Sequence, residues 1–178
     1  MARGQAIGAA GELIVQARLL LRGWVVGNLN TGGMPNAPAV DLVAAKGNQT
    51  IKISVKATGH QSDAVQWRRD HDAESMFKGD VRPDFVIFVW FADPADLDAC
   101  RIFVVPADVV DRDILGGMRE VFARRRESGK TYTVNDHMAI WWKSPKGVEH
   151  PTRGFAEKWA CYENAWDILE GVSAFAQA

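Results

Sequence analysis

Residues 40–56 have the sequence VDLVAAKGNQTIKISVK, and this stretch decides the fold that we expect. Two runs of aliphatic and β-branched residues flank the turn formers at 46–49 (KGNQ), a pattern that predicts a β-hairpin. Strand side chains alternate between faces, so Ser54 and Lys56 point the same way while their neighbours point into the opposite layer. Asp41, at the start of the first strand, can therefore meet Lys56 across the pair.

The composition is that of one ordinary domain spanning residues 1–178. The chain has 178 residues and 47% hydrophobic content, enough to bury a sizeable core. Lys and Arg number 21 against 22 Asp and Glu, so composition predicts no overall field that would draw the protein onto nucleic acid. This balance counts mildly against a strong non-specific DNA binder.

The two cysteines, Cys100 and Cys161, lie far apart with no paired spacing, which favours neither a disulfide framework nor a zinc site. A reducing cytoplasm fits this usage best. No apolar run approaches the ~20 residues that a membrane helix needs, and the N-terminus lacks the long apolar core of a secretory signal. We therefore expect a soluble cytoplasmic protein without a membrane partner.

Apolar periodicity and turn residues predict the other elements. We expect a helix at about 5–22, a short strand from 24, the hairpin over 40–56, a short helix within 70–77, strands at 84–91 and 101–106, a helical turn at 107–110, a helix at 116–128, an edge strand at 138–142 and a closing amphipathic helix at 155–172. This α-β-β-β-α-β order over about 8–106, followed by an extension over 107–178, predicts an α/β fold with a central mixed β-sheet flanked by helices.

Three elements of this core carry polar residues in a fixed order: Glu12 in the first helix, Asp41 at the start of the second core strand, and Ser54-Val55-Lys56 on the third. The set resembles the PD-(D/E)XK nuclease superfamily, with its restriction-endonuclease-like core, over roughly residues 8–106. Family members carry an acid-x-Lys tripeptide on the third strand, and here Ser54 stands in place of the acid. Ala39-Val40 precede the aspartate where the family has a proline.

The resemblance implies a Mg²⁺- or Mn²⁺-dependent endonuclease that hydrolyses DNA phosphodiester bonds. Asp41 would be the principal metal ligand and the backbone carbonyl of Val55 a second one, because hard Mg²⁺ takes oxygen ligands. Lys56 would orient or deprotonate the attacking water and stabilise the growing negative charge. Glu12 would act at the rim of the site through a bridging water.

The serine at position 54 leaves three interpretations open. In one branch of restriction endonucleases that the site resembles, the missing carboxylate comes from the following helix, and Asp70 is our first candidate for that role. Alternatively, Ser54 is a weak polar ligand through water, and cleavage persists on Asp41, Glu12 and Lys56. In the third interpretation activity is lost, and the folded scaffold only binds.

Aromatic and basic residues supply candidate contacts to nucleic acid. Trp67, Arg68 and Arg69 combine a ring with two cations near the predicted site, which is typical of base stacking or backbone contact. Trp67 as a cover of the core, beside two solvated arginines, is an equal alternative. The arginines at 124–126 could touch phosphates, although cations that end a helix also complement its dipole, and we favour the latter.

Two other functions remain open. A catalytically inactive module of the same fold would bind nucleic acid or a protein partner, and a homodimer could form through the aromatic C-terminal helix. The aromatic and aliphatic stripe expected on that helix comprises Phe155, Trp159, Tyr162, Trp166 and Leu169. A plain α/β domain would use Asp41 and Lys56 only as an ion pair.

Overall fold

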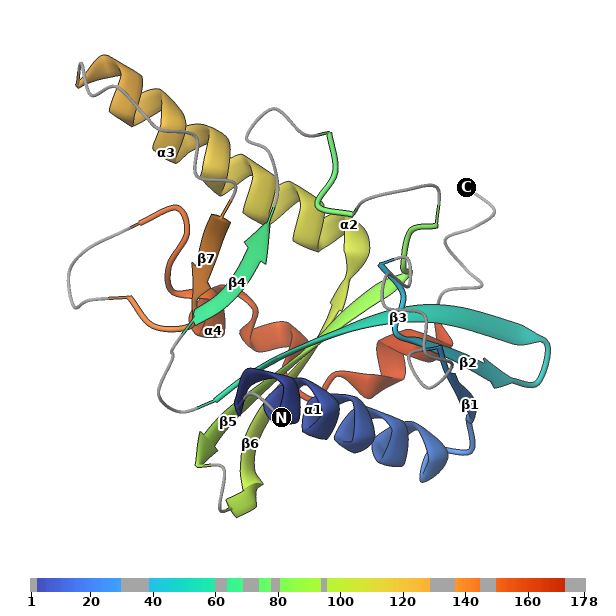
Figure 1. The fold of residues 1–178 in the computed structure, drawn as a ribbon. Coiled ribbons are helices and arrows are strands. Elements are labelled where there is room, and N and C mark those ends of the chain that lie inside the picture. Colours follow the sequence, from blue (N-terminus) through green and yellow to red (C-terminus); the bar gives the residue numbers. More distant parts are fainter. Residues whose placement is uncertain are drawn as a thin grey trace.

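The computed structural model describes residues 3–29, 39–59, 64–68, 74–77, 81–93, 96–128, 137–144 and 150–171. Its helices and strands follow one another along the chain as shown in Figure 1. They are α1 (Arg3–Leu20), β1 (Val25–Asn28), β2 (Leu42–Lys46), β3 (Gln49–Thr58), β4 (Ala64–Arg68), β5 (Phe85–Asp93), β6 (Asp96–Pro106), α2 (Ala107–Val110), the π-helical turn η2 (Asp111–Leu115), α3 (Gly116–Glu127), β7 (His137–Trp141), α4 (Phe155–Lys158), and the 3-10 turns η3 (Ala160–Tyr162) and η4 (Trp166–Glu170).

A five-stranded mixed sheet in the order β1-β2-β3-β5-β6 forms the centre of the molecule. Its strands pair antiparallel except for β3 and β5, which run parallel and are connected through β4. Helices flank the sheet on both sides, so the α/β fold with a central mixed sheet that the sequence predicts is confirmed (Figure 1).

The hairpin over residues 40–56 is also confirmed. β2 and β3 pair from Leu42 opposite Ile53 to Lys46 opposite Gln49, and Gly47 takes the positive φ of 59° that the tight turn requires. β3 extends beyond the start of β2, where it pairs with β5 alone as far as Thr58. We call this part of β3, beyond Ile53, the overhang of β3. Along its edge that faces away from β5, it has no β2 residue as a partner, and Asp41, which precedes β2, lies beside it.

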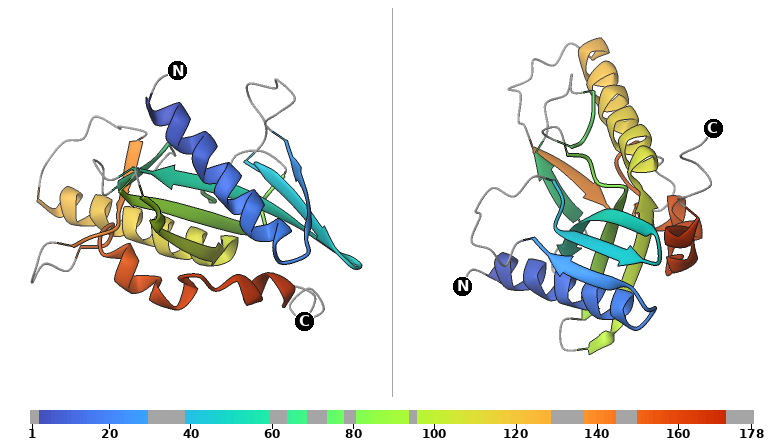
Figure 2. Two further views of the ribbon diagram at one scale, coloured as in Figure 1. Left: turned by 90° about the horizontal axis from the view of Figure 1, so that it is seen from below. Right: turned by 90° about the vertical axis from the view of Figure 1, so that its right-hand side faces the viewer.

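Two hydrophobic clusters cover the two faces of the sheet. One contains Val15 and Leu19 of α1 packed on the sheet residues Ile53 and Val55. The other joins the sheet to α2, α3, β4, β7 and α4. Figure 2 accordingly shows α1 and α3 on opposite sides of the sheet. A Cβ at Gly11 would lie 2.6 Å from the Cβ of Ala57, so glycine permits α1 to approach β3 this closely.

The strand expected over 84–91 is the central strand β5, and its residues Phe85–Phe91 are all buried. Such burial requires apolar side chains on both faces, as the sequence indicates. The helical turn expected at 107–110 and the helix expected at 116–128 are present as α2 and α3, and the π-helical turn η2, which the sequence did not indicate, joins them into one long helix. None of the helices in the described part of the chain is long and apolar enough to cross a lipid bilayer.

The segment between β3 and β5 differs from the expected short helix. Its described part at 74–77 is not helical, and residues 70–73 lie outside the described residues. Ala64–Arg68 form strand β4 instead, which pairs antiparallel with β7 in a separate two-stranded sheet. The edge strand predicted near 138–142 is thus present as β7, with β4 as its partner.

The closing helix predicted over 155–172 is wrong in its described part. The chain forms the short elements α4, η3 and η4 and crosses the open edge of the sheet, where Glu163 bridges to Phe103 of β6 and the Asn164 N–H donates to the Ile102 carbonyl. Asn164 takes a positive φ of 52°, which no continuous helix permits.

The aromatic stripe of this segment packs inside the protein. Phe155 and Trp159 are buried on one face of the sheet, and Trp166 and Leu169 are buried on the other. Four of the five residues of this stripe are thus buried within the subunit, and the expected homodimer contact is not supported.

Candidate active site

The candidate site lies on the overhang of β3, where the residues that precede β2 reach across it. The register of β2 and β3 ends at Leu42 opposite Ile53, and just beyond it the Asp41 N–H donates to the carbonyl of Ile53 (2.8 Å). The side chain of Asp41 lies beside those of Ser54 and Lys56, because it accepts a hydrogen bond from the Ser54 hydroxyl and lies 4.0 Å from Lys56 Nζ. The alternation expected from the sequence places all three as predicted.

The carboxylate of Asp41 is held by its neighbours on β3. Its Oδ2 accepts hydrogen bonds from the Val55 N–H (2.6 Å) and from the Ser54 hydroxyl (3.1 Å). Ser54 is 1% exposed, whereas the side chain of Asp41 is 18% exposed. Ser54 is therefore a buried donor that positions the carboxylate, a role that the sequence did not reveal.

Lys56 completes the polar group. Its Nζ lies 4.0 Å from Asp41 Oδ2, and its side chain is 30% exposed. Nζ also lies 5.4 Å from the centre of the Trp67 ring, a cation-π contact. Trp67 itself packs against Phe77 and Phe88 of the core, with ring centroids 5.7 and 6.4 Å away. The ring of Trp67 thus covers part of the core and forms one wall beside the lysine.

The backbone of Val55 faces the same opening. In a strand, the N–H and the C=O of one residue point to the same side. Because the Val55 N–H donates to Asp41, its carbonyl lies on the β2 side of β3 as well, beyond the point where pairing with β2 ends. A carboxylate and a backbone carbonyl oxygen are thereby presented along one edge.

Glu12 reaches the region from the other side of the sheet. The turn of α1 that carries it packs on β3, as the contact of Gly11 with Ala57 shows. Its Oε2 accepts a hydrogen bond from the side chain of Asn28 (3.2 Å), and Asn28 pairs with Leu42 directly beside Asp41. Asn28, which the sequence did not single out, therefore connects Glu12 to the strand end that bears Asp41.

The other predicted site residues are described only in part. Arg68 ends β4, but its side chain is not among the described residues, and Arg69 and Asp70 lie outside them. Within the described ranges, no three His, Cys, Asp or Glu side chains gather closely enough to hold a metal ion. A carboxylate-rich cage is therefore not formed by the described residues alone.

Asp84 repeats the local arrangement of Asp41 at another strand start. It directly precedes β5, and its Oδ2 accepts the N–H of Lys52 on β3 at 2.7 Å. The sequence signal is the same in both places, an aspartate immediately before an apolar strand. Since only Asp41 has an ion pair to Lys56, the two carboxylates form a natural comparison.

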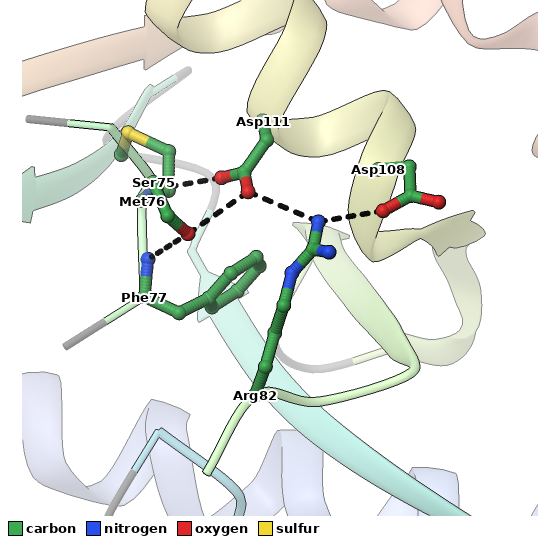
Figure 3. Close-up of polar contacts among 6 residues, drawn as sticks. All are labelled: Ser75, Met76, Phe77, Arg82, Asp108 and Asp111. Atoms are coloured by element: carbon green, nitrogen blue, oxygen red, sulfur yellow. Dashed lines mark hydrogen bonds and ion pairs between the residues drawn. The ribbon is translucent and has the colours of Figure 1, made fainter. Parts of the chain in front are cut away.

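A third aspartate, Asp111, anchors the chain that leads from β4 to β5 (Figure 3). Its carboxylate accepts the Met76 N–H at 2.6 Å and the Ser75 hydroxyl at 2.8 Å, and it lies 3.0 Å from the Arg82 guanidinium. Arg82 also pairs with the exposed Asp108 at 2.7 Å. The start of the long helix thereby fixes residues that follow the candidate acid Asp70.

Comparison with known proteins finds structural likeness of low similarity. No family model and no curated protein matches the chain. Among solved structures, the bacterial homing endonuclease I-Ssp6803I is similar over 99% of this chain and 99% of its own, with 17% sequence identity and a TM-score of 0.49. At this identity and score, the likeness says nothing about individual residues.

Proposed function

We propose that this protein is a nuclease that hydrolyses DNA phosphodiester bonds with the aid of a divalent cation, at the overhang of β3. The observation that supports this most is the convergence of Asp41, the backbone of Val55 and Lys56 on one partly exposed edge. An acidic ligand, a carbonyl oxygen and a cation side by side are the groups that metal-assisted phosphodiester hydrolysis requires.

The donor set suits Mg²⁺ or Mn²⁺. These hard cations prefer oxygen ligands, and Mg²⁺ is usually held by one or two carboxylates together with water and substrate phosphate. Asp41 and the Val55 carbonyl would hold the ion, and Glu12 would reach it through water. A cation bound there supplies positive charge to the non-bridging phosphate oxygens.

The protein's own residues prepare the reaction. The Val55 N–H and the Ser54 hydroxyl fix the rotamer of Asp41, so that its carboxylate does not have to be ordered when substrate binds. Lys56 orients the attacking water and stabilises the negative charge that grows on the phosphate. Trp67 beside Lys56 limits the directions from which water reaches the ammonium group.

The source of a second carboxylate stays open between two of the proposed interpretations. Asp70 would supply it if the segment after β4 turns toward the overhang of β3. With Ser54 donating to Asp41 instead, the site would work with a single direct carboxylate, and we then expect weaker metal binding. For DNA contacts we propose Trp67 with Arg68 and Arg69, because β4 places Trp67 against Lys56.

The direct test is divalent-cation-dependent nicking of supercoiled plasmid. We expect nicking with Mg²⁺ or Mn²⁺ that falls by about 10²-fold or more in Asp41→Ala and in Lys56→Ala, as for the loss of a catalytic acid–base or electrostatic group. The matched control is Asp84→Ala, which removes a carboxylate that also accepts a β3 N–H but has no ion pair to Lys56. It should nick within a few-fold of the wild type.

One observation favours a catalytically inactive DNA-binding module instead. Ser54 stands where the resembled family has an acid, and its hydroxyl donates a hydrogen bond to Asp41 Oδ2, one of the two oxygens that could bind a metal ion. In that case plasmid stays intact with every divalent cation while the chain still binds DNA in a gel-shift assay. Equal nicking by the wild type and by Asp41→Ala would exclude this centre as the source of any activity.

A further inference from the structure

Three polar residues of β3 form a row on the face of the sheet that α1 does not cover. The apolar residues at 51, 53 and 55 belong to the hydrophobic cluster beneath α1. Strand side chains alternate between faces, so Lys52, Ser54 and Lys56 lie on the opposite face. Ser54 and Lys56 are part of the proposed nuclease centre, whereas Lys52 is not. The two lysines flank the serine along the strand, each at about 7 Å from it.

The ammonium group of Lys52 has no partner among the residues that the structure describes. The backbone N–H of Lys52, and not its side chain, donates to the Asp84 carboxylate (2.7 Å). In contrast, Lys46 pairs with Glu170 at 2.6 Å. The side chain of Lys52 is half-buried, and partial burial deprives an ammonium group of some of its water. An anionic ligand would replace that water with a charge-assisted hydrogen bond.

Lys52 lines a cavity of about 620 Å³ at the start of β5. Two acidic residues also line it, but both are engaged within the protein. Asp84 accepts the Lys52 N–H, and Asp108 pairs with Arg82 at 2.7 Å (Figure 3). Lys52 is therefore the cation of this cavity that a ligand can reach without breaking an ion pair of the described residues. Most of the wall is apolar and includes Phe85, Pro106 and Val109.

We infer that Lys52 binds a phosphate group of the DNA strand that is cut, next to the scissile phosphate, with the attached deoxyribose against the apolar wall of the cavity. The inference rests on the proposed action on DNA. It is supported by the spacing along β3, because the distance from Ser54 to Lys52 is comparable to that between neighbouring phosphates of one strand. A cavity of this volume is large enough for a nucleotide unit.

The face of the sheet that carries Lys52 is open toward β1 and β2. The hydrophobic cluster on this face contains no residue of either strand. Of the described residues on β1, Val25 is 74% exposed. A DNA strand can therefore approach along β3 from this side. Lys52 would then fix the position of the substrate relative to Asp41 and Lys56 without touching the reacting atoms.

The salt dependence of DNA binding tests this contact. Fluorescence anisotropy with a short duplex in EDTA measures the binding constant, and each phosphate contact contributes about 0.9 to the slope of its logarithm against that of the salt concentration. Lys52→Gln should bind more weakly, and its slope should be smaller in magnitude by about 0.9. Lys52→Arg keeps the charge, and its slope should equal that of the wild type.

Lys46→Gln is the matched control. It removes the same charge from a strand lysine whose side chain is 38% exposed. Lys46 lies on the other face, with Nζ 5.9 Å from the ring centre of Trp24 in the cluster beneath α1. Its slope should equal that of the wild type, and circular dichroism checks that each variant is folded. Equal slopes for the wild type and Lys52→Gln, or equal weakening by Lys52→Gln and Lys52→Arg, overturns the inference.

Plasmid nicking, measured on the same proteins, separates this inference from the nuclease proposal. Nicking by a wild type whose slope does not change in Lys52→Gln would overturn the Lys52 contact and leave the nuclease function in place. DNA binding with a slope that depends on Lys52, but without nicking under any divalent cation, would support the contact and contradict the nuclease function. A wild type that does not bind DNA overturns the inference.

Discussion

Two aspartates of this protein have similar backbone surroundings and differ in their side-chain neighbours. Asp41 and Asp84 each precede an apolar strand, and each accepts a backbone N–H of β3. The ion pair with Lys56 belongs to Asp41 alone among the two. The side chains of Lys56 and Ser54, and not the backbone hydrogen bond, therefore distinguish the carboxylate proposed for chemistry from one that only caps a strand start.

Asp111 gives a prediction about stability. Asp111→Ala leaves the Met76 N–H and the Ser75 hydroxyl without their acceptor, and the free energy of unfolding should fall by about 2 to 3 kcal/mol. Chemical denaturation measures the change.

Asp108→Ala is the matched control for this change. Asp108 pairs with the same arginine, but its side chain is 86% exposed, and the loss should be below about 0.5 kcal/mol. Equal losses in the two variants would contradict the anchoring role of Asp111.

Much of the candidate site could be predicted from sequence, and the reason is the two-residue period of strands. Asp41, Ser54 and Lys56 are predicted to share a face because the hairpin turn fixes the register, and they do. The donor role of Ser54 could not be predicted, since a serine at that position is equally compatible with a water ligand. Asn28 has no local signal at all, because its contact with Glu12 joins two elements.

Among the helices and strands, the sequence predicted the elements whose signal is a local pattern of residues. The hairpin, α1, the buried strand β5 and the helices α2 and α3 all have their signal within a few residues. β4 does not, because its mixed sequence becomes a strand only by pairing with β7, far along the chain. Its polar residues gave no alternation that distinguishes a strand from a loop.

The C-terminal segment shows how tertiary contacts override periodicity. Trp159, Tyr162 and Trp166 have helical spacing, yet the chain must pass from one face of the sheet to the other around β6. At that crossing, Asn164 donates its N–H to Ile102. Sequence spacing cannot show that a stripe will be divided between two cores.

An ion pair secures this crossing. The guanidinium of Arg101 on β6 makes two hydrogen bonds of 2.7 Å to the carboxylate of Glu163. These hydrogen bonds, more than any other influence, hold the pKa of Glu163 below its usual value. A carboxyl with a lowered pKa in the folded state stabilises the protein above its unfolded pKa of about 4.3, and this stabilisation is lost as pH falls through the folded pKa.

Glu163→Gln tests this link. At pH 7 the variant should unfold at lower urea concentration than the wild type, because it lacks the charged pair with Arg101. The difference should narrow as pH falls through the lowered pKa of Glu163, where the carboxylate of the folded wild type takes up a proton. Glu127→Gln, an exposed change at the end of α3, should differ little from the wild type at either pH. A Glu163→Gln difference that does not change with pH would contradict the assignment.

In the whole molecule, the candidate active site lies between the two layers that cover the faces of the central sheet. One face of the sheet is covered by α1, and the other by the long helix with β4 and β7. The overhang of β3 lies where both layers contribute, with Glu12 from the first and Trp67 from the second.

The most direct test of the proposed centre is anomalous scattering from crystals that contain Mn²⁺. We predict one peak at about 2 Å from a carboxylate oxygen of Asp41 and from the Val55 carbonyl oxygen, within reach of Glu12 through water. Crystals of Asp41→Ala should lack that peak, whereas Asp84→Ala should retain it. Mn²⁺ bound elsewhere, with Asp41 Oδ2 still hydrogen-bonded to Ser54 and Val55 and no peak beside it, would contradict the proposal that these residues form a cation-dependent nuclease site.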